Sequence, residues 1–145
     1  MNLYLKNMKI FKDKKIIRTK GKYDFVDITD LVKDVIKKSG IKDGIGLIFL
    51  PHTTAGFYFN EDESGLIKDF KNFLDKILSE EEKYYHNRLG EGNASSHLKN
   101  TIFKPIFEFI VEDNDILLGT WQRIFLVEFD NTQRQREIFF KIIGE

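Results

Sequence analysis

The chain has 145 residues, 41% of them hydrophobic, so it is long enough for one hydrophobic core and too short for two ordinary domains. Lysine plus arginine equal aspartate plus glutamate at 23 each, which removes any bulk electrostatic case for binding nucleic acid. Cysteine is absent, which excludes disulfides, thiolate nucleophiles and cysteine-ligated zinc. We therefore expect one domain, residues 1–145, with the cytosol as the default compartment.

The beginning of the chain carries charges throughout, without the apolar run of a signal peptide. Nowhere do about 18 apolar residues occur together, which is the length that a transmembrane helix requires. We expect a soluble, unprocessed protein with no membrane partner.

Two extended segments begin the chain. Residues Met8 to Thr19 and Lys22 to Asp27 flank the turn-prone pair Lys20 and Gly21, which predicts an opening β-hairpin.

An amphipathic helix is predicted next, because apolar residues recur at helical spacing from Ile28 to Ile36. Asp27 or Thr29 can cap its start, and Gly40 can end it.

The middle of the chain predicts two strands followed by two helices. The short apolar run Gly46 to Leu50 and the segment Ala55 to Asn60 are typical of strands. Apolar residues then recur at steps of three and four from Leu66 to Leu78, which indicates the clearest helix in the chain. A short helix is expected from Asn93, as its cap, to about Ile102.

Three strands are predicted in the last third, at Ile106 to Glu112, Leu117 to Phe129 with a break near Gly119, and Glu137 to Ile143. No repeat or linker interrupts the pattern. The fold class expected is therefore α+β.

The three histidines are the best candidates for chemistry, because all lie in polar motifs. His52 follows a predicted buried strand in PHTTAGFYFNE, while His86 and His97 lie on either side of a glycine-rich loop in YYHNRLGEGNASSHLK. Three imidazoles can hold a divalent ion and leave a position open for water or substrate. Without a metal they can transfer protons. Each histidine taken alone is also compatible with a structural role.

Other polar residues have open alternatives. Lys99, near the predicted helix start, favours an anion, although a plain surface lysine fits equally well. Glu128 in a strand needs a partner if it is buried and can orient an imidazole. Arg134 and Arg136 would face one side of a strand and hold phosphate, unless they form a solvated turn.

Taken together, HTTAG, NE, YHN, GNASSHLK, LGTWQ and the terminal IIGE resemble the YjbQ-like family of secondary thiamine phosphate synthases, over about Asp27 to Glu145. The resemblance implies a β-sandwich of about seven strands with two main helices and one short helix, in the order ββα ββα βββ, assembled as a homotrimer. Two segments depart from the family: DESGLIKDF replaces a segment rich in Asp and Pro, and DNTQRQR replaces a D-G-P-R-x-R turn.

The residues that match the family's polar motifs form the predicted site. The expected metal ligands are His52, His86 and His97. The expected catalytic residues are Glu61, Lys99, Gln122 and Glu128. The expected substrate contacts are Thr53, Thr54, Asn60, Asn93, Thr120, Arg134 and Arg136.

Three functions remain open. The resemblance implies weak thiamine phosphate synthase activity, which joins a pyrimidine methyl diphosphate to a thiazole phosphate, beside an unidentified main reaction. Because three histidines prefer zinc or a similar ion, whereas diphosphate usually pairs with magnesium, a metal-dependent hydrolase of a small phosphorylated or acyl compound is the second hypothesis. A trimeric module that binds a metabolite or metal without turnover is the third.

Overall fold

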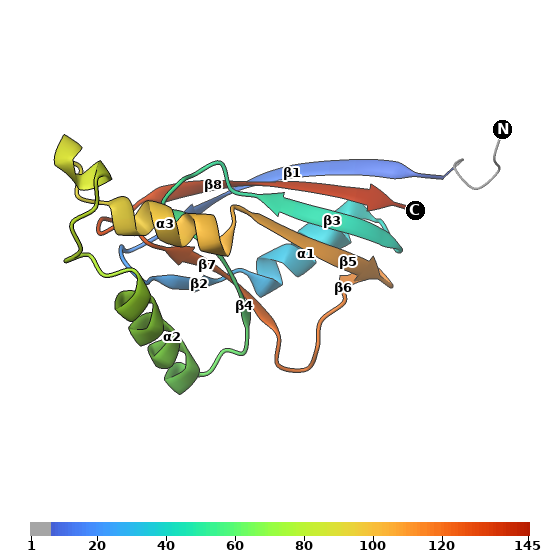
Figure 1. The fold of residues 1–145 in the computed structure, drawn as a ribbon. Helices are drawn as coiled ribbons and strands as arrows, with labels where there is room; N and C mark the ends of the chain where they lie inside the picture. Colours follow the sequence, from blue (N-terminus) through green and yellow to red (C-terminus); the bar gives the residue numbers. More distant parts are fainter. Residues whose placement is uncertain (1–6) are drawn as a thin grey trace.

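The computed structural model describes residues 7–145. Within this range, eight strands form two antiparallel sheets, and three α-helices and one 3₁₀ helix accompany them. The elements in chain order are β1 (Lys9–Arg18), β2 (Phe25–Asp27), α1 (Thr29–Ser39), β3 (Gly44–Phe49), β4 (Ala55–Asn60), α2 (Ser64–Ile77), η2 (His86–Leu89), α3 (Ala94–Phe103), β5 (Ile106–Glu112), β6 (Asp115–Ile116), β7 (Arg123–Glu128) and β8 (Gln135–Gly144). Figure 1 shows the long strands β1, β8, β3 and β5 on one side and α2 on the other. The predicted α+β class is confirmed, with one very short strand, β6, beyond the seven expected.

The first two strands belong to different sheets, so the predicted opening hairpin is wrong. β1 pairs with β8 over ten residue pairs, from Lys9 opposite Gly144 to Arg18 opposite Gln135. β2 pairs with β7 instead. The turn between β1 and β2 contains Gly21 (φ 130°) and Tyr23 (φ 59°), which redirect the chain from the larger sheet to the smaller one.

The two sheets enclose the main core. The larger sheet has the order β1-β8-β3-β5-β6 and the smaller one β2-β7-β4. Along β7, side chains alternate between two cores: Ile124 and Leu126 join the main core, which also receives α1, whereas Phe125 and Val127 face the opposite side. This alternation follows from the two-residue period of a strand.

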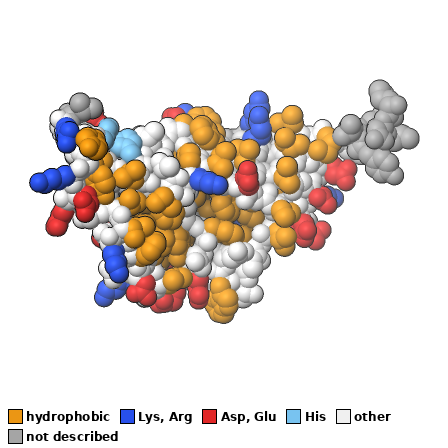
Figure 2. Space-filling view, viewed as in Figure 1, with side chains coloured by type: hydrophobic (Ala, Val, Ile, Leu, Met, Phe, Trp, Pro, Cys, Tyr) orange, Lys and Arg blue, Asp and Glu red, His pale blue; other side chains and the backbone are white. Residues whose placement is uncertain are grey.

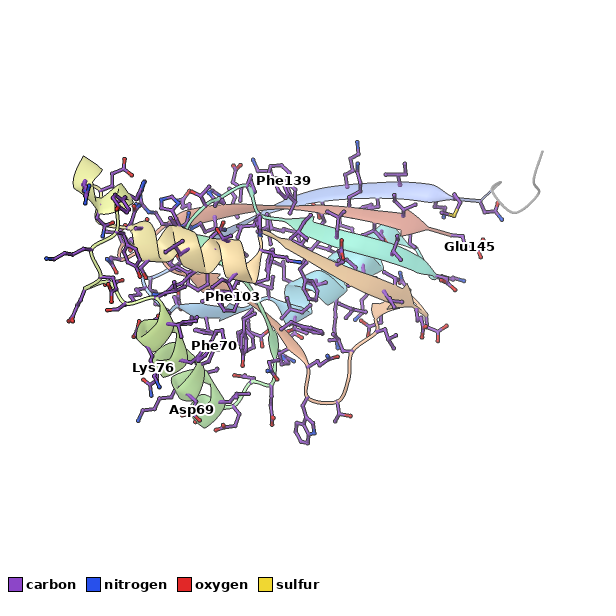
Figure 3. All side chains as sticks on the ribbon, in the orientation of Figure 1. Asp69, Phe70, Lys76, Phe103, Phe139 and Glu145 are labelled. Atoms are coloured by element: carbon purple, nitrogen blue, oxygen red, sulfur yellow. The ribbon has the colours of Figure 1, made fainter. Side chains whose placement is uncertain are left out.

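The second core lies between the smaller sheet and helices α2 and α3. Phe70 of α2 and Phe103 of α3 meet edge to face at 5.1 Å, and Phe70 also contacts Tyr58 of β4. Figure 3 shows Asp69 and Lys76 of α2 extending away from this core. Phe70 and Leu74 of α2 therefore pack as the amphipathic pattern predicts, whereas Phe73 and Ile77, which belong to the same pattern, are exposed.

The helix ends follow the capping chemistry of the sequence. In α1, the cap position is Ile28 and not Asp27 or Thr29 as predicted, although Asp27 accepts a hydrogen bond from the Thr29 amide. Gly40 ends the helix with a left-handed conformation, as predicted. The Glu63 carboxylate caps α2 by accepting from the amides of Gly65 and Leu66. None of the helices in residues 7–145 combines the length and apolarity needed to cross a membrane.

The outward face of the larger sheet carries two apolar rows. Strand register aligns four isoleucines across β1, β8, β3 and β5, namely Ile10, Ile143, Ile45 and Ile110. Ile10 and Ile45 are each 65% exposed. A second row consists of Phe139, Phe49 and Ile106, and between the two rows lie Lys12, Lys141, Leu47 and Glu108. Figure 2 shows hydrophobic side chains gathered over β3 and β5, with charged side chains beside them.

Candidate functional site

A buried ion pair joins the two sheets at the end of the molecule where β7 stops and β8 begins. Glu128 of the smaller sheet is 0% exposed, and it accepts hydrogen bonds from Arg136 of the larger sheet at 2.5 and 2.8 Å. Two charges buried together are stable only if their remaining polar atoms also find partners.

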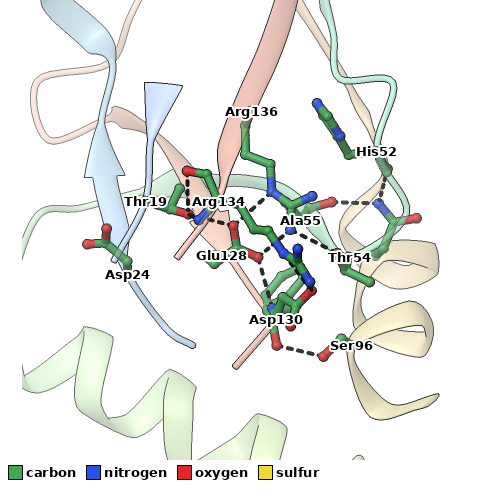
Figure 4. Close-up of polar contacts among 12 residues, drawn as sticks. Thr19, Asp24, His52, Thr54, Ala55, Ser96, Glu128, Asp130, Arg134 and Arg136 are labelled. Atoms are coloured by element: carbon green, nitrogen blue, oxygen red, sulfur yellow. Dashed lines mark hydrogen bonds and ion pairs between the residues drawn. The ribbon is translucent and has the colours of Figure 1, made fainter. Parts of the chain in front are cut away.

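Hydrogen bonds satisfy this pair on all sides (Figure 4). Thr19 donates to Glu128 at 2.7 Å, and Arg136 donates to the Thr54 hydroxyl at 2.8 Å. The Asp130 amide donates to the second carboxylate oxygen of Glu128 at 2.9 Å. Glu128 is thus partnered by a guanidinium, a hydroxyl and an amide, and none of these hydrogen bonds involves the imidazole that it was expected to orient.

His52 lies beside this network. Its Nε2 accepts a hydrogen bond from the Glu137 amide at 3.0 Å, so the neutral ring carries its proton on Nδ1. Burial, reinforced by the nearby Arg136 charge, lowers the pKa of His52 below its usual value. This hydrogen bond anchors the His52 ring to the backbone of β8.

The other two histidines meet near the start of α3. The rings of His86 and His97 are 4.9 Å apart and nearly perpendicular. Ligand atoms of His86, Glu91 and His97 all lie within 4.8 Å of one another, and His52 does not belong to this group. The structure thus brings together two of the three expected metal ligands and adds Glu91, which the sequence motifs did not single out.

The loop between η2 and α3 creates this proximity. Gly90 and Gly92 adopt positive φ angles of 91° and 65°, which allow the chain to turn back sharply. Asn93 occupies the cap position of α3 as predicted, but its side chain contacts His86 Nε2 at 3.2 Å instead of capping the helix. Asn87 accepts from the Ala94 amide in its place.

Two imidazoles and a carboxylate form a donor set suited to zinc or a similar ion. Zinc holds such ligands at about 2.0–2.2 Å, so donor atoms within 4.8 Å of one another need only small side-chain movements to bind one ion. The side chains of His86 and Glu91 are 40% and 65% exposed, so a bound ion would remain open to solvent and to a small molecule.

Lys99, on the same helix, lies in the second core. It is fully buried, its Nζ is 3.8 Å from an Asp75 carboxylate oxygen, and the amine faces the ring of Tyr23. Burial and the neighbouring Lys22 lower the pKa of Lys99, and Asp75 offsets this only in part. The alternative of a plain surface lysine is therefore wrong, and the amine is enclosed rather than presented to an anion.

Four predicted site residues lie at the opposite end of the smaller sheet. Asn60 ends β4 opposite Arg123, five residues along the strand from Ala55, which is opposite Glu128. Five residues of strand span about 17 Å. The group comprises Asn60, Glu61, Thr120 and Gln122, and Gln122 forms a turn by accepting from the Gly119 amide. Within one chain, these residues are separated from the Glu128 end.

The remaining predicted residues differ in exposure. Thr53 is exposed in the turn before β4, whereas Thr54 is buried against Arg136. Arg134 is about half exposed and binds Asp130 through Nε and Nη2, so it does not share the buried environment of Arg136. Burial raises the pKa of Asp130, but the hydrogen bond and charge of Arg134 lower it by more than burial raises it. The pKa of Asp130 therefore lies below its usual value.

Comparison with known proteins identifies the family. The family model described as "UPF0047 protein YjbQ-like" matches residues 14–145. The chain belongs to this family. The match begins earlier than the motifs indicated, because it includes the second half of β1.

Members of the YjbQ-like family from distant organisms are similar over most of their length. The UPF0047 protein MJ1081 of Methanocaldococcus jannaschii is 40% identical over 130 residues, which cover 89% of this chain and 91% of that protein. YugU of Bacillus subtilis is 35% identical, with 88% and 96% covered. A YbjQ-like protein of unknown function from Sulfolobus solfataricus matches in structure with a TM-score of 0.90 and 37% identity, covering 96% of this chain and all of that one.

Proposed function

We propose that this protein is a divalent-metal-dependent enzyme that acts on a small phosphorylated or acyl compound at the His86–Glu91–His97 group. The observation that carries the proposal is the convergence of three potential ligand atoms within 4.8 Å at an exposed position. The donor set favours zinc over magnesium, because magnesium prefers oxygen ligands alone.

A bound zinc-like ion would polarise a substrate oxygen and lower the pKa of a coordinated water. The chain's own residues position the ligands: Asn93 holds His86 through Nε2, and His97 is fixed in the first turns of α3. Ser96, the neighbour of His97, donates to the Phe129 carbonyl at 2.6 Å and thereby anchors this end of α3 to the smaller sheet.

We further propose that the chain acts as a homotrimer. The two apolar rows on the outward face of the larger sheet support this, because several large exposed apolar side chains on one sheet face are typical of an interaction surface. The separation of Asn60, Glu61, Thr120 and Gln122 from the histidine group also supports it. In a trimer, the Asn60 end of one copy can approach the histidine group of a neighbouring copy. The first copy would then supply Glu61 as the general base at the neighbour's histidine group.

Weak thiamine phosphate synthase activity is the second candidate. It is supported by the motif resemblance and by two arginines, Arg18 and Arg134, that lie where β1 ends beside the start of β8. Both reactions can be assayed on the same preparation, because the condensation releases pyrophosphate whereas hydrolysis of a monoester releases phosphate.

The test compares chelator-treated protein before and after zinc is restored, using a panel of small phosphate esters and acyl esters. We expect turnover that disappears on metal removal and returns with zinc, and that His97→Ala abolishes. Zinc-independent pyrophosphate release would favour the second candidate. Metal or metabolite binding without any turnover would contradict both and indicate a binding module.

A further inference from the structure

A polar hollow lies where β1 ends beside the beginning of β8. Its volume is about 330 Å³, and it is lined by Arg18, Thr19, Gln133, Arg134 and Gln135. Arg18 and Gln135 are directly opposite each other in the sheet. Thr19 and Arg134 follow and exchange hydrogen bonds, from the Thr19 amide to the Arg134 carbonyl and from the Arg134 amide to the Thr19 hydroxyl. The walls of the hollow are thus fixed by backbone pairing.

The guanidinium of Arg18 has no carboxylate partner among residues 7–145. The acidic residue on the same face, Glu137, lies opposite Ile16 and is paired with Lys14 at 2.6 Å. Arg18 therefore contributes an uncompensated positive charge to the hollow.

Arg134 contributes a guanidinium that is already oriented. Its Nε and Nη2 bind one oxygen of Asp130, at 3.0 and 2.8 Å, and these bonds leave Nη1 available. Asp130 balances one of the two arginine charges, and the Asp24 carboxylate, which accepts from the Lys20 amide, is not among the residues that line the hollow. With Arg18, Arg134 and Asp130 counted together, the hollow carries one net positive charge.

We infer that this hollow binds the phosphate group of a small substrate. A guanidinium matches phosphate oxygens in a bidentate geometry, and two guanidiniums together with the side-chain amides of Gln133 and Gln135 offer more donors than a carboxylate can use. This inference rests on the proposed function and narrows its substrate class from phosphorylated or acyl compounds to phosphorylated ones.

The hollow is connected to the histidine group by a short structural path. Asp130, which orients Arg134, directly follows Phe129, whose carbonyl accepts from Ser96. Ser96 precedes His97 on α3. The same end of the molecule therefore carries both the candidate metal ligands and the arginines of the hollow.

The test is a calorimetric titration of metal-free protein with inorganic phosphate at constant ionic strength. The variants are Arg18→Gln and Arg134→Gln, and the control is Arg123→Gln, which removes an arginine from the opposite end of the smaller sheet. We expect wild-type protein and the control to bind phosphate equally, and each test variant to bind roughly tenfold more weakly, since one charge-assisted contact is lost. Circular dichroism verifies that Arg134→Gln remains folded; Arg18, on the surface, carries the test independently.

Absence of phosphate binding by the metal-free wild type would overturn the inference, as would equal binding by wild type and Arg18→Gln. Binding that requires zinc and is lost in His86→Ala would also overturn it, because the phosphate would then lie on the metal. Since the titration uses metal-free protein, its result is independent of whether the histidine group binds a metal.

Discussion

At the scale of single residues, the Glu128–Arg136 pair dominates the end of the molecule where both sheets meet. Glu128 continues the inward-facing positions of β7 after Ile124 and Leu126, so a charge occupies a core position. The opposite sheet supplies the compensating charge. Such a pair holds the sheets in one relative register, since neither charge can be moved into apolar surroundings without its partner.

Removing one partner should be strongly destabilising. For Arg136→Met we expect a loss of about 3–5 kcal/mol in the free energy of unfolding, because Glu128 is left buried and unpaired. The double variant Glu128→Leu/Arg136→Met should recover most of this loss. Urea denaturation measures both, with Arg123→Met as a surface control at about 1 kcal/mol or less. Equal destabilisation of the single and double variants would contradict this account.

The lowered pKa of His52 gives stability a defined pH dependence. Its native pKa lies below the unfolded value of 6.5, so the unfolded chain takes up the proton first as the pH falls. This contribution is fully present above pH 6.5 and is lost as the pH decreases toward the native pKa. His52→Gln keeps an acceptor for the Glu137 amide without titrating. The variant should lose less stability than wild type between about pH 7 and 5 in thermal melts; identical slopes would refute the assignment.

At the scale of elements, α3 is the helix that connects the parts of the candidate site. Ser96 binds the end of β7, His97 faces His86, and Asn100 donates to the carbonyls of His52 and Ala55 at 3.0 and 2.5 Å. A helix of ten residues thus fixes both the histidine group and the turn before β4.

Loss of the Asn100 side chain should loosen that turn. Asn100→Ala leaves two carbonyls without their donor, and we expect a loss of about 1–3 kcal/mol in unfolding free energy. Hydrogen exchange should accelerate at residues 52–55. Thr101→Ala is the matched control, because its hydroxyl binds only within the helix, to the His97 carbonyl. Exchange that changes equally in both variants would contradict a specific anchoring role.

The element boundaries show what sequence periodicity can and cannot predict. Helix α2, strand β4 and strand β5 agree closely with the predicted ranges, because each has a clear apolar pattern in the sequence: helical spacing in α2, a short apolar run in β4 and alternation in β5. The pairing of β1 with β8 could not be predicted from adjacent segments, since the partners are more than 100 residues apart. The histidines illustrate the same limit: spacing indicated that His86 and His97 can meet, but only the fold shows that His52 lies outside the group and that Glu91 takes its place.

At the scale of the whole molecule, the outward face of the larger sheet is the surface on which assembly should depend. The isoleucine row crosses four strands, and its register places Ile45 between Ile143 and Ile110. An exposed row of this length needs a covering surface, and in a cyclic trimer a different surface of the neighbouring copy covers it, since the same face packed on itself would give a two-fold dimer.

A charge in the centre of this row should disrupt the proposed trimer. Ile45→Glu introduces a carboxylate that cannot be desolvated at an apolar interface, so sedimentation should show monomers in place of trimers. Ile77→Glu, which adds the same charge at an exposed position on α2, should remain trimeric. A wild-type protein that sediments as a monomer, or an Ile45→Glu variant that stays trimeric, would contradict the proposed interface.

The central claim is that His86, Glu91 and His97 bind a divalent metal and that His52 does not take part. Elemental analysis after equilibration with zinc and removal of the unbound ion tests this directly. We expect close to one zinc per chain in wild type and in His52→Ala, and little in His86→Ala or His97→Ala. Wild type that retains no metal, or loss of the metal in His52→Ala while the protein remains folded, would contradict the claim.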